Sequence, residues 1–339
     1  MEPLIDDIGS FPLPNGIKRE TFAQAYIQTR QTIIDGKDPT QDEFLQKNFC
    51  QIIIDTFRLK IACGLDVINF PHFSGLPQIG NAIHEAMDKG SFVVDQQKAV
   101  LPEIYVINKY AKELSEEFGK KIMLRVSIFG PIEQYLHEVG ATAYPDVLDG
   151  FAQTINRYAK NALLNNKYIQ TKAVSIDEPS LGHTSFTASP ELIIQTLQSA
   201  YDFQGPTKQI HLHFTTEIHN LLNVKGLDVL SFEYAASPKN IDAVPKKILE
   251  KADKQIRVGI SRTDIDSIWA ELYEKGITNP TNEQLIEPED TIRKRYRYAK
   301  EKYEERLAFT GPDCGLGPWP NQQSAEQLLK RTVNAVKNC

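Results

Sequence analysis

The chain has 339 residues, of which 41% are hydrophobic and 24% charged, an ordinary balance for a globular protein that buries a large core. Its formal net charge is −6 and it lacks a basic patch with interleaved aromatic residues, so nucleic acid is not an expected partner. The acidic balance also argues against an anionic membrane surface as a partner, and no run approaches the roughly 20 apolar residues that span a bilayer.

Short runs rich in β-branched residues recur along the chain, and a longer helical pattern follows most of them. The predicted strands are Leu4–Ile8, Leu65–Phe70, Met123–Phe129, Ala173–Ile176, Gln209–Phe214, Val229–Phe232, Ile256–Ile260 and Leu307–Thr310. The predicted helices are Gln41–Ala62, Val100–Phe118, Pro145–Leu164, Pro190–Phe203, Ile241–Lys251, Ile265–Lys275, Pro288–Glu304 and Gln322–Val336. Strands that alternate with helices pair in parallel through right-handed crossovers.

This alternation predicts an α/β fold, a single (β/α)8 TIM barrel over residues 1–339. An open doubly wound sheet would be expected to carry a glycine-rich phosphate turn after its first strand. Here that turn reads Gly9-Ser10-Phe11-Pro12, which is not GxGxxG. Two segments interrupt the alternation: a long, partly helical excursion at about 11–40 and a flap-like loop at about 275–289.

The cysteines and the first residues indicate a compartment. Cys50, Cys63, Cys314 and Cys339 form no CxxC pair and no framework of a small disulfide-rich domain. Residues 1–9 contain acids in place of the basic and apolar regions of a signal peptide. The predicted location is therefore the reducing cytoplasm.

Side chains that can bind a metal follow three of the predicted strands, where a barrel of this kind places its active site. His211 and His213 are two residues apart on the fifth strand and share a face, Glu233 ends the sixth strand, and Cys314 follows the eighth. Imidazole, carboxylate and thiolate are all zinc ligands. The sequence predicts a zinc site of His213, Glu233 and Cys314, with His211 as a further candidate. Taken singly, each residue is equally consistent with a structural role, since a lone cysteine is usually a small core hydrophobe.

Five segments carry a resemblance to a known family. They are Ile8–Pro12 (IGSFP), Gly64–Val67 (GLDV), Phe129–Pro131 (FGP), Ile176–Leu181 (IDEPSL) and Pro312–Leu316 (PDCGL). In this order they resemble the catalytic C-terminal barrel of the cobalamin-independent methionine synthases, within the uroporphyrinogen decarboxylase-like superfamily. The resemblance implies a zinc-dependent methyltransferase that transfers a methyl group to the thiol of homocysteine, forming methionine.

The resemblance also implies roles for individual residues. The expected substrate-binding residues are Ile8, Gly9, Ser10, His72 and Asp177. Ile8 to Ser10 would hold the amino-acid part of homocysteine, and Asp177 would contact its amine. The expected catalytic residues are Asp177, His213 and Cys314, and the expected zinc ligands are His213, Glu233 and Cys314, with His211 in reserve.

Three positions depart from the family pattern. Thr215 replaces a strand-5 cysteine that is a zinc ligand in the family, and a neutral hydroxyl is a poor ligand compared with a thiolate. His72 aligns near an acidic residue that helps to bind the substrate amine. The histidine expected after strand 7 as a proton donor is replaced by a residue near Asp266.

The methyl donor and the exact activity have alternatives. Single-barrel relatives of this size resemble enzymes that take the methyl group from a corrinoid protein, so a methylcorrinoid donor is expected rather than folate. The acceptor could instead be another small thiol. A metal-free lyase of the decarboxylase type would need arginines at the mouth, where only Arg262 is well placed. A binding barrel of the same family that lacks catalysis is the third alternative.

Overall fold

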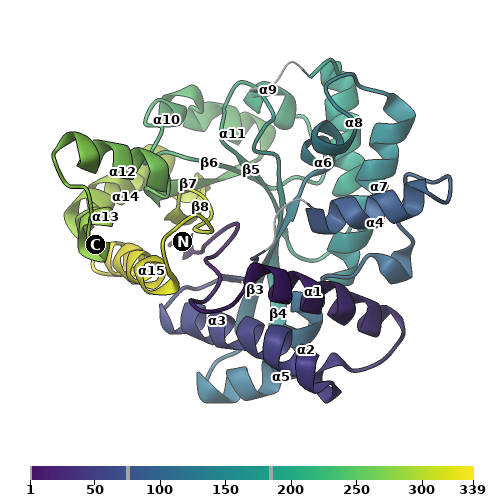
Figure 1. Ribbon diagram of the computed structural model, residues 1–339. Coiled ribbons are helices and arrows are strands. Elements are labelled where there is room, and N and C mark those ends of the chain that lie inside the picture. Colours follow the sequence, from purple (N-terminus) through teal and green to yellow (C-terminus); the bar gives the residue numbers. More distant parts are fainter. Residues whose placement is uncertain (1, 74–76, 183–185) are drawn as a thin grey trace.

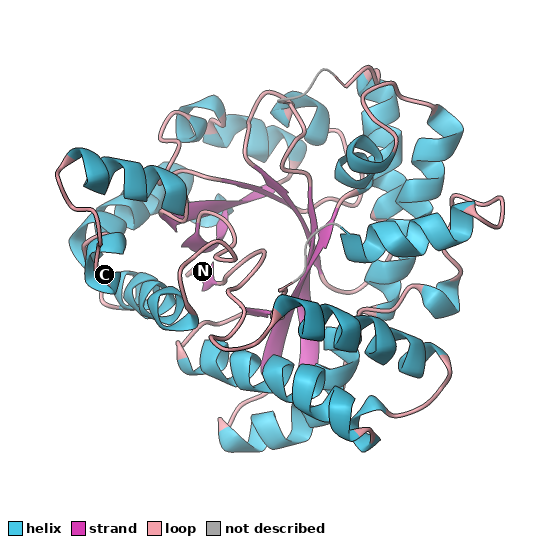
Figure 2. Ribbon diagram, viewed as in Figure 1, coloured by secondary structure: helices cyan, strands magenta, loops and turns pink. Residues whose placement is uncertain are grey.

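The computed structural model describes residues 2–73, 77–182 and 186–339 and shows a curled sheet of eight parallel strands ringed by helices (Figures 1 and 2). The strands are β1 (Leu4–Ile5), β2 (Ile68–Asn69), β3 (Ile122–Phe129), β4 (Ile169–Asp177), β5 (Thr207–Leu212), β6 (Val229–Phe232), β7 (Gln255–Ser261) and β8 (Leu307–Pro312). Their order in the sheet is β1-β8-β7-β6-β5-β4-β3-β2. A parallel bridge between Asp6 and Val67 joins the two ends of the sheet. The predicted single-domain (β/α)8 barrel is confirmed.

The helices form the outer layer around the sheet (Figure 2). They are α1 (Arg19–Ile34), α2 (Glu43–Leu45), α3 (Gln51–Ala62), α4 (Pro77–Met87), α5 (Pro102–Glu117), α6 (Pro131–Glu138), α7 (Pro145–Asn161), α8 (Pro190–Ala200), α9 (Ile218–Leu221), α10 (Asn240–Ala243), α11 (Lys246–Ala252), α12 (Ile265–Glu274), α13 (Asn282–Leu285), α14 (Glu289–Tyr303) and α15 (Gln322–Lys337). Short helical turns lie at η1 (Pro39–Gln41), η2 (Gln46–Cys50), η3 (Gln96–Lys98) and η4 (Glu304–Arg306). Prolines open α5, α6, α7 and α8, because the first helical turn needs no N–H donor there.

Each predicted strand is present, but the first two are shorter than expected. Where the segments of β1 and β2 meet, a side chain replaces a main-chain carbonyl as the acceptor, because the N–H of Asn69 donates to the Asp7 carboxylate at 2.9 Å. The predicted helix Ile241–Lys251 is divided into α10 and α11 at Pro245, which cannot donate a helical hydrogen bond. The excursion at 11–40 contains α1, and the segment at 275–289 contains α13. The sequence analysis missed α4, α6 and α9.

A buried cluster of charges crosses the barrel interior. Arg125 on β3 and Arg257 on β7 are fully buried, and both contact the carboxylate of Asp6. Arg125 Nη1 lies 2.5 Å from Asp6 Oδ2, and Arg257 Nε lies 2.7 Å from Asp6 Oδ1. Because β3 and β7 are not neighbours in the sheet, these contacts must cross the barrel interior. Loss of one partner would leave a buried charge uncompensated, which would strongly destabilise the fold.

Two further findings bear on the sequence expectations. Among the described residues, no helix has both the length and the apolar character that a membrane crossing requires. All four cysteines are free thiols, with Cys50 and Cys63 buried, Cys314 partly exposed and Cys339 exposed.

Candidate metal centre

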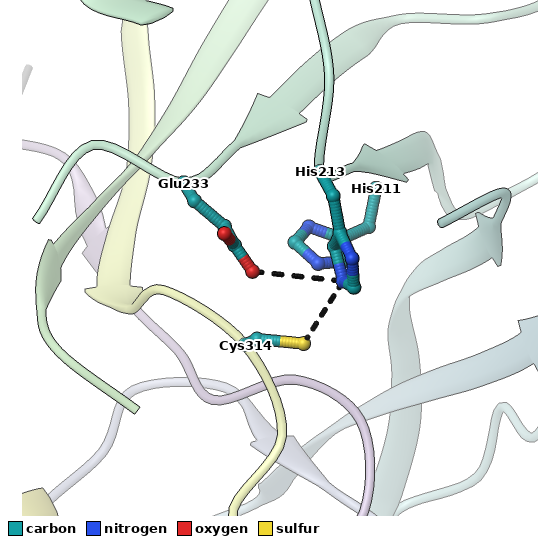
Figure 3. Close-up of side chains that lie close together, drawn as sticks. All are labelled: His211, His213, Glu233 and Cys314. Carbon is teal, nitrogen blue, oxygen red and sulfur yellow. Dashed lines mark hydrogen bonds and ion pairs between the residues drawn. The ribbon is translucent and has the colours of Figure 1, made fainter. Parts of the chain in front are cut away.

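Four metal-capable side chains converge at the carboxyl-terminal ends of three strands (Figure 3). His211 is the penultimate residue of β5 and His213 follows that strand directly. Glu233 comes directly after β6, and Cys314 lies two residues beyond β8. The strand ends of a parallel barrel share one mouth, which brings residues together that are about 100 positions apart in the chain. The sequence prediction that these residues meet is confirmed.

The spacing of the four groups suits a single metal ion. His213 Nε2 lies 3.4 Å from Cys314 Sγ and 3.5 Å from Glu233 Oε1. One ligand atom from each of the four residues lies within 4.8 Å of all the others. Tetrahedral zinc with nitrogen and sulfur ligands requires ligand atoms roughly 3.4–3.8 Å apart. The two separations from His213 Nε2 fall in this range, and the donor set is one that zinc accepts.

Burial favours the uncharged form of each of these groups. Burial, with the nearby charge of Glu233, raises the pKa of the Cys314 thiol to about 12. Burial, with Asp313 and Asp264, raises the pKa of the Glu233 carboxyl to about 8. Burial also lowers the pKa of His213. A divalent cation among these side chains would reverse the preference, because it stabilises thiolate and carboxylate.

Asp313 positions both Glu233 and Cys314. Its Oδ1 accepts hydrogen bonds from the backbone N–H groups of Tyr234 and Ala235, each at 3.0 Å. Its Oδ2 accepts from Ala236 N at 2.6 Å. Asp313, which precedes Cys314 in the chain, therefore fixes the loop that follows Glu233. The sequence indicated Asp313 only as a neighbour of Cys314 in the PDCGL motif.

Asn240, at the start of α10, binds both ligand-bearing loops. Its Nδ2 donates to the main-chain oxygen of Glu233 at 2.9 Å and to that of His213 at 3.2 Å. Its Oδ1 accepts from the Thr215 hydroxyl at 3.5 Å. The Thr215 hydroxyl, at the position where the resemblance implied a cysteine, is thus directed at the side-chain amide of Asn240. The sequence analysis missed Asn240, because no motif marks it and its role depends on two separate loops.

The predicted substrate segment lies against the loop that carries Cys314. Gly9 has φ +65°, and a Cβ there would come within 3.0 Å of Gly315 Cα. Ser10 O accepts from Leu316 N at 2.7 Å, and Ser10 Oγ accepts from Gly317 N at 3.2 Å. Ile8 is buried. The IGSFP and PDCGL motifs are therefore one structural unit, whose close approach requires glycine.

Asp177 ends β4 beside the candidate metal centre. Its Oδ1 accepts from Ser175 Oγ at 2.5 Å, and its negative charge contributes to the raised pKa of Cys314. Burial raises the pKa of Asp177 to about 6, while Arg125 and Arg257 oppose this rise.

His72 lies after β2, beside the substrate segment, where Phe11 N donates to its main-chain oxygen at 3.0 Å. Its ring centroid is 5.7 Å from that of Phe70 and 5.9 Å from that of Phe129. Burial lowers the pKa of His72 to about 4, so the ring is neutral at pH 7. The position near which the family carries an acidic residue therefore has no charge here.

Three further residues bear on the expectations from the sequence. Asp266, near which the strand-7 proton donor aligned, is exposed in the first turn of α12. Arg262 is at the mouth but forms ion pairs at 2.7 Å with both Asp264 and Glu271. Glu178 of the DEPSL motif is buried and caps α6, accepting from the N–H groups of its first turn. The helix that Glu178 caps precedes the DEPSL motif in the chain.

The fold and these four side chains define a class, a (β/α)8 barrel with a candidate metal centre at its carboxyl-terminal mouth. No protein-family model matches the sequence. In sequence, the chain is similar to a methionine synthase from Sulfolobus acidocaldarius, with 26% identity over 217 residues. The match covers 63% of this chain and 55% of that protein, so it spans about half the length of the relative.

Two solved structures share the fold. One is a B12-independent methionine synthase from a Shewanella species in complex with selenomethionine, with a TM-score of 0.61 and 14% identity over 100% of this chain and 98% of that one. The other is a methyltransferase from Methanosarcina mazei, with a TM-score of 0.55 and 12% identity over 99% of this chain and 94% of that one. At these identities the likeness is one of fold.

Proposed function

We propose that this protein is a zinc-dependent methyltransferase that methylates the thiol of homocysteine to give methionine. The observation that carries the proposal is the convergence of His213, Glu233 and Cys314 at one barrel mouth, with His213 Nε2 3.4 Å from Cys314 Sγ. The similarity to a methionine synthase and the fold shared with a second one support this choice among the chemistries that such a barrel can host.

The residues at the mouth suit each part of this substrate. His213, Glu233 and Cys314 would hold the metal, which when bound supplies the positive charge that favours a thiolate at neutral pH. The Asp177 carboxylate would accept hydrogen bonds from the substrate ammonium, and the Gly9–Ser10 segment would lie along the carboxylate of the substrate. These contacts would fix the sulfur in position, and misplacement by about 1 Å can cost roughly 100-fold in rate.

The reaction balances without an oxidant or a reductant. The thiol loses its proton to solvent, and its sulfur forms a bond to the methyl carbon. The bond between that carbon and the donor breaks, and its electron pair leaves with the donor. None of the three similar proteins points to a particular donor for this chain, so the assay needs both a corrinoid and a folate.

The test is methionine formation by zinc-loaded protein given homocysteine and either methylcobalamin, as a probe for a corrinoid donor, or methyltetrahydrofolate. Methionine measured by mass spectrometry should appear with one donor and disappear with Cys314→Ala. No methionine with either donor, from protein that binds both zinc and homocysteine, would contradict the proposal. In that case the binding barrel without catalysis becomes the better description.

A different thiol acceptor is the second candidate, and His72 is the observation that favours it. Its neutral ring lies where the family carries an acid that helps to hold the amine. If the acceptor has no amine, a deaminated analogue such as 4-mercaptobutanoate should compete as well as homocysteine does. Homocysteine binding that is much tighter than that of the analogue would rule this candidate out.

A further inference from the structure

The three proposed ligands leave one corner of a tetrahedral site to be filled. The family pattern would fill it from strand 5 with a cysteine, but Thr215 stands there. The Thr215 hydroxyl donates to Asn240 Oδ1 at 3.5 Å, and a neutral hydroxyl is a weak ligand for zinc. A fourth protein ligand, if the site has one, must therefore come from elsewhere on the chain.

His211 is the side chain placed to supply it. It is 3% exposed, and one of its ring nitrogens belongs to the group of atoms that lie within 4.8 Å of one another. Its Nδ1 lies 3.3 Å from Ser231 Oγ, while its Nε2 is buried and has no hydrogen-bond partner in the described part of the chain. An unpaired polar atom at this depth costs free energy, which a metal bond would recover.

We propose that His211 is the fourth protein ligand of this centre and takes over the role of the missing strand-5 cysteine. The inference rests on the proposed function, because it assumes a metal at the mouth. Ser231 holds the imidazole by Nδ1, and this contact leaves the lone pair of Nε2 for the metal. Metal-binding histidines are commonly oriented in this way through their second nitrogen.

The exchange of a cysteine ligand at position 215 for His211 changes the charge of the centre. A thiolate at position 215 would give the protein ligands three negative charges, whereas His211, His213, Glu233 and Cys314 supply two. These two balance a divalent cation, so an anionic thiolate, which would bind as a fifth ligand or displace one of the four, meets a neutral centre rather than a negative one. The same exchange of sulfur for nitrogen makes the ligand set less soft, which weakens its preference for zinc over the other divalent metals.

Zinc affinity, measured by competition with a chromogenic chelator, tests the inference without any activity assay. His211→Asn keeps an amide near Ser231 but removes the imidazole, and it should weaken zinc binding by about 10- to 100-fold or more. His219→Asn is the matched control, because His219 is exposed on α9, and it should bind as the wild type does. Thr215→Cys should tighten zinc binding and make it less sensitive to His211→Asn.

A measurement on the unaltered chain covers the case in which His211→Asn does not fold. With ¹⁵N-labelled histidine, zinc addition should shift the ring nitrogens of two of the seven histidines, whereas a centre without His211 should shift one. Wild-type binding by His211→Asn, or a shift of one histidine, would overturn the inference alone. A wild-type chain that binds no zinc would instead overturn the proposed function.

Discussion

The amide nitrogen of Asn240 donates to the main-chain oxygen of Glu233 at 2.9 Å, seven residues earlier in the chain. The same nitrogen also reaches the main-chain oxygen of His213 at 3.2 Å. One side chain thus fixes the distance between the loops after β5 and β6. The separation of the imidazole and the carboxylate at the candidate centre depends on this bridge.

Asn240→Asp should therefore weaken zinc binding. The change keeps the shape of the side chain but removes the N–H groups that bind both loops. Loss of such supporting contacts costs roughly 10- to 100-fold in metal affinity. Chelator competition would measure the affinity, with Asn223→Asp as the control, because Asn223 is exposed and its side-chain amide donates to a carbonyl of α9. Equal affinities for the two variants would show that the loops hold their spacing without Asn240.

Cys314→Ala should remove the metal. The Cys314 thiol is partly exposed and contacts the His213 ring, so the variant should fold while it loses most of its zinc. Metal analysis of the purified protein should show about one zinc per chain lost relative to the wild type. Cys339→Ala, at an exposed thiol, should keep its zinc. Full zinc content in Cys314→Ala would place the metal elsewhere.

Asp177→Asn should raise KM for homocysteine by about 10- to 100-fold, because a charge-assisted contact to the ammonium is lost. The effect on 4-mercaptobutanoate, which has no amine, should be small. Since burial raises the pKa of Asp177 to about 6, the ionised form that binds an ammonium is lost as the pH falls through that value. KM of the wild type for homocysteine should accordingly rise below pH 6, and equal losses for both thiols would contradict this role.

The sequence predicted the parts of this molecule that depend on local pattern. The eight strands follow from runs of β-branched residues, and the meeting of His213 with Cys314 follows from their position after strand ends. Contacts between separate segments could not be predicted in this way. Asn240 binds two loops that only the fold brings together.

Glu103 makes the stability of the barrel depend on pH. It lies in the first turn of α5, fully buried, and neither carboxylate oxygen has a hydrogen-bond partner among the residues described. Burial raises the pKa of its carboxyl to about 8, above the ordinary value of 4.5. The folded chain therefore holds this proton more tightly than the unfolded chain. The free energy of unfolding should fall as the pH rises from about 4.5 through about 8.

Glu103→Gln removes this titration and should stabilise the protein at alkaline pH. At about 1.4 kcal/mol per pKa unit, the gain above pH 8 is on the order of 5 kcal/mol as an upper bound. Below pH 4.5 both side chains are neutral, and the gain should vanish. Urea unfolding at pH 4 and at pH 8.5 would measure it, with Glu116→Gln, exposed on the same helix, as the control. A gain of equal size at both pH values would show that the buried proton of Glu103 is not its source.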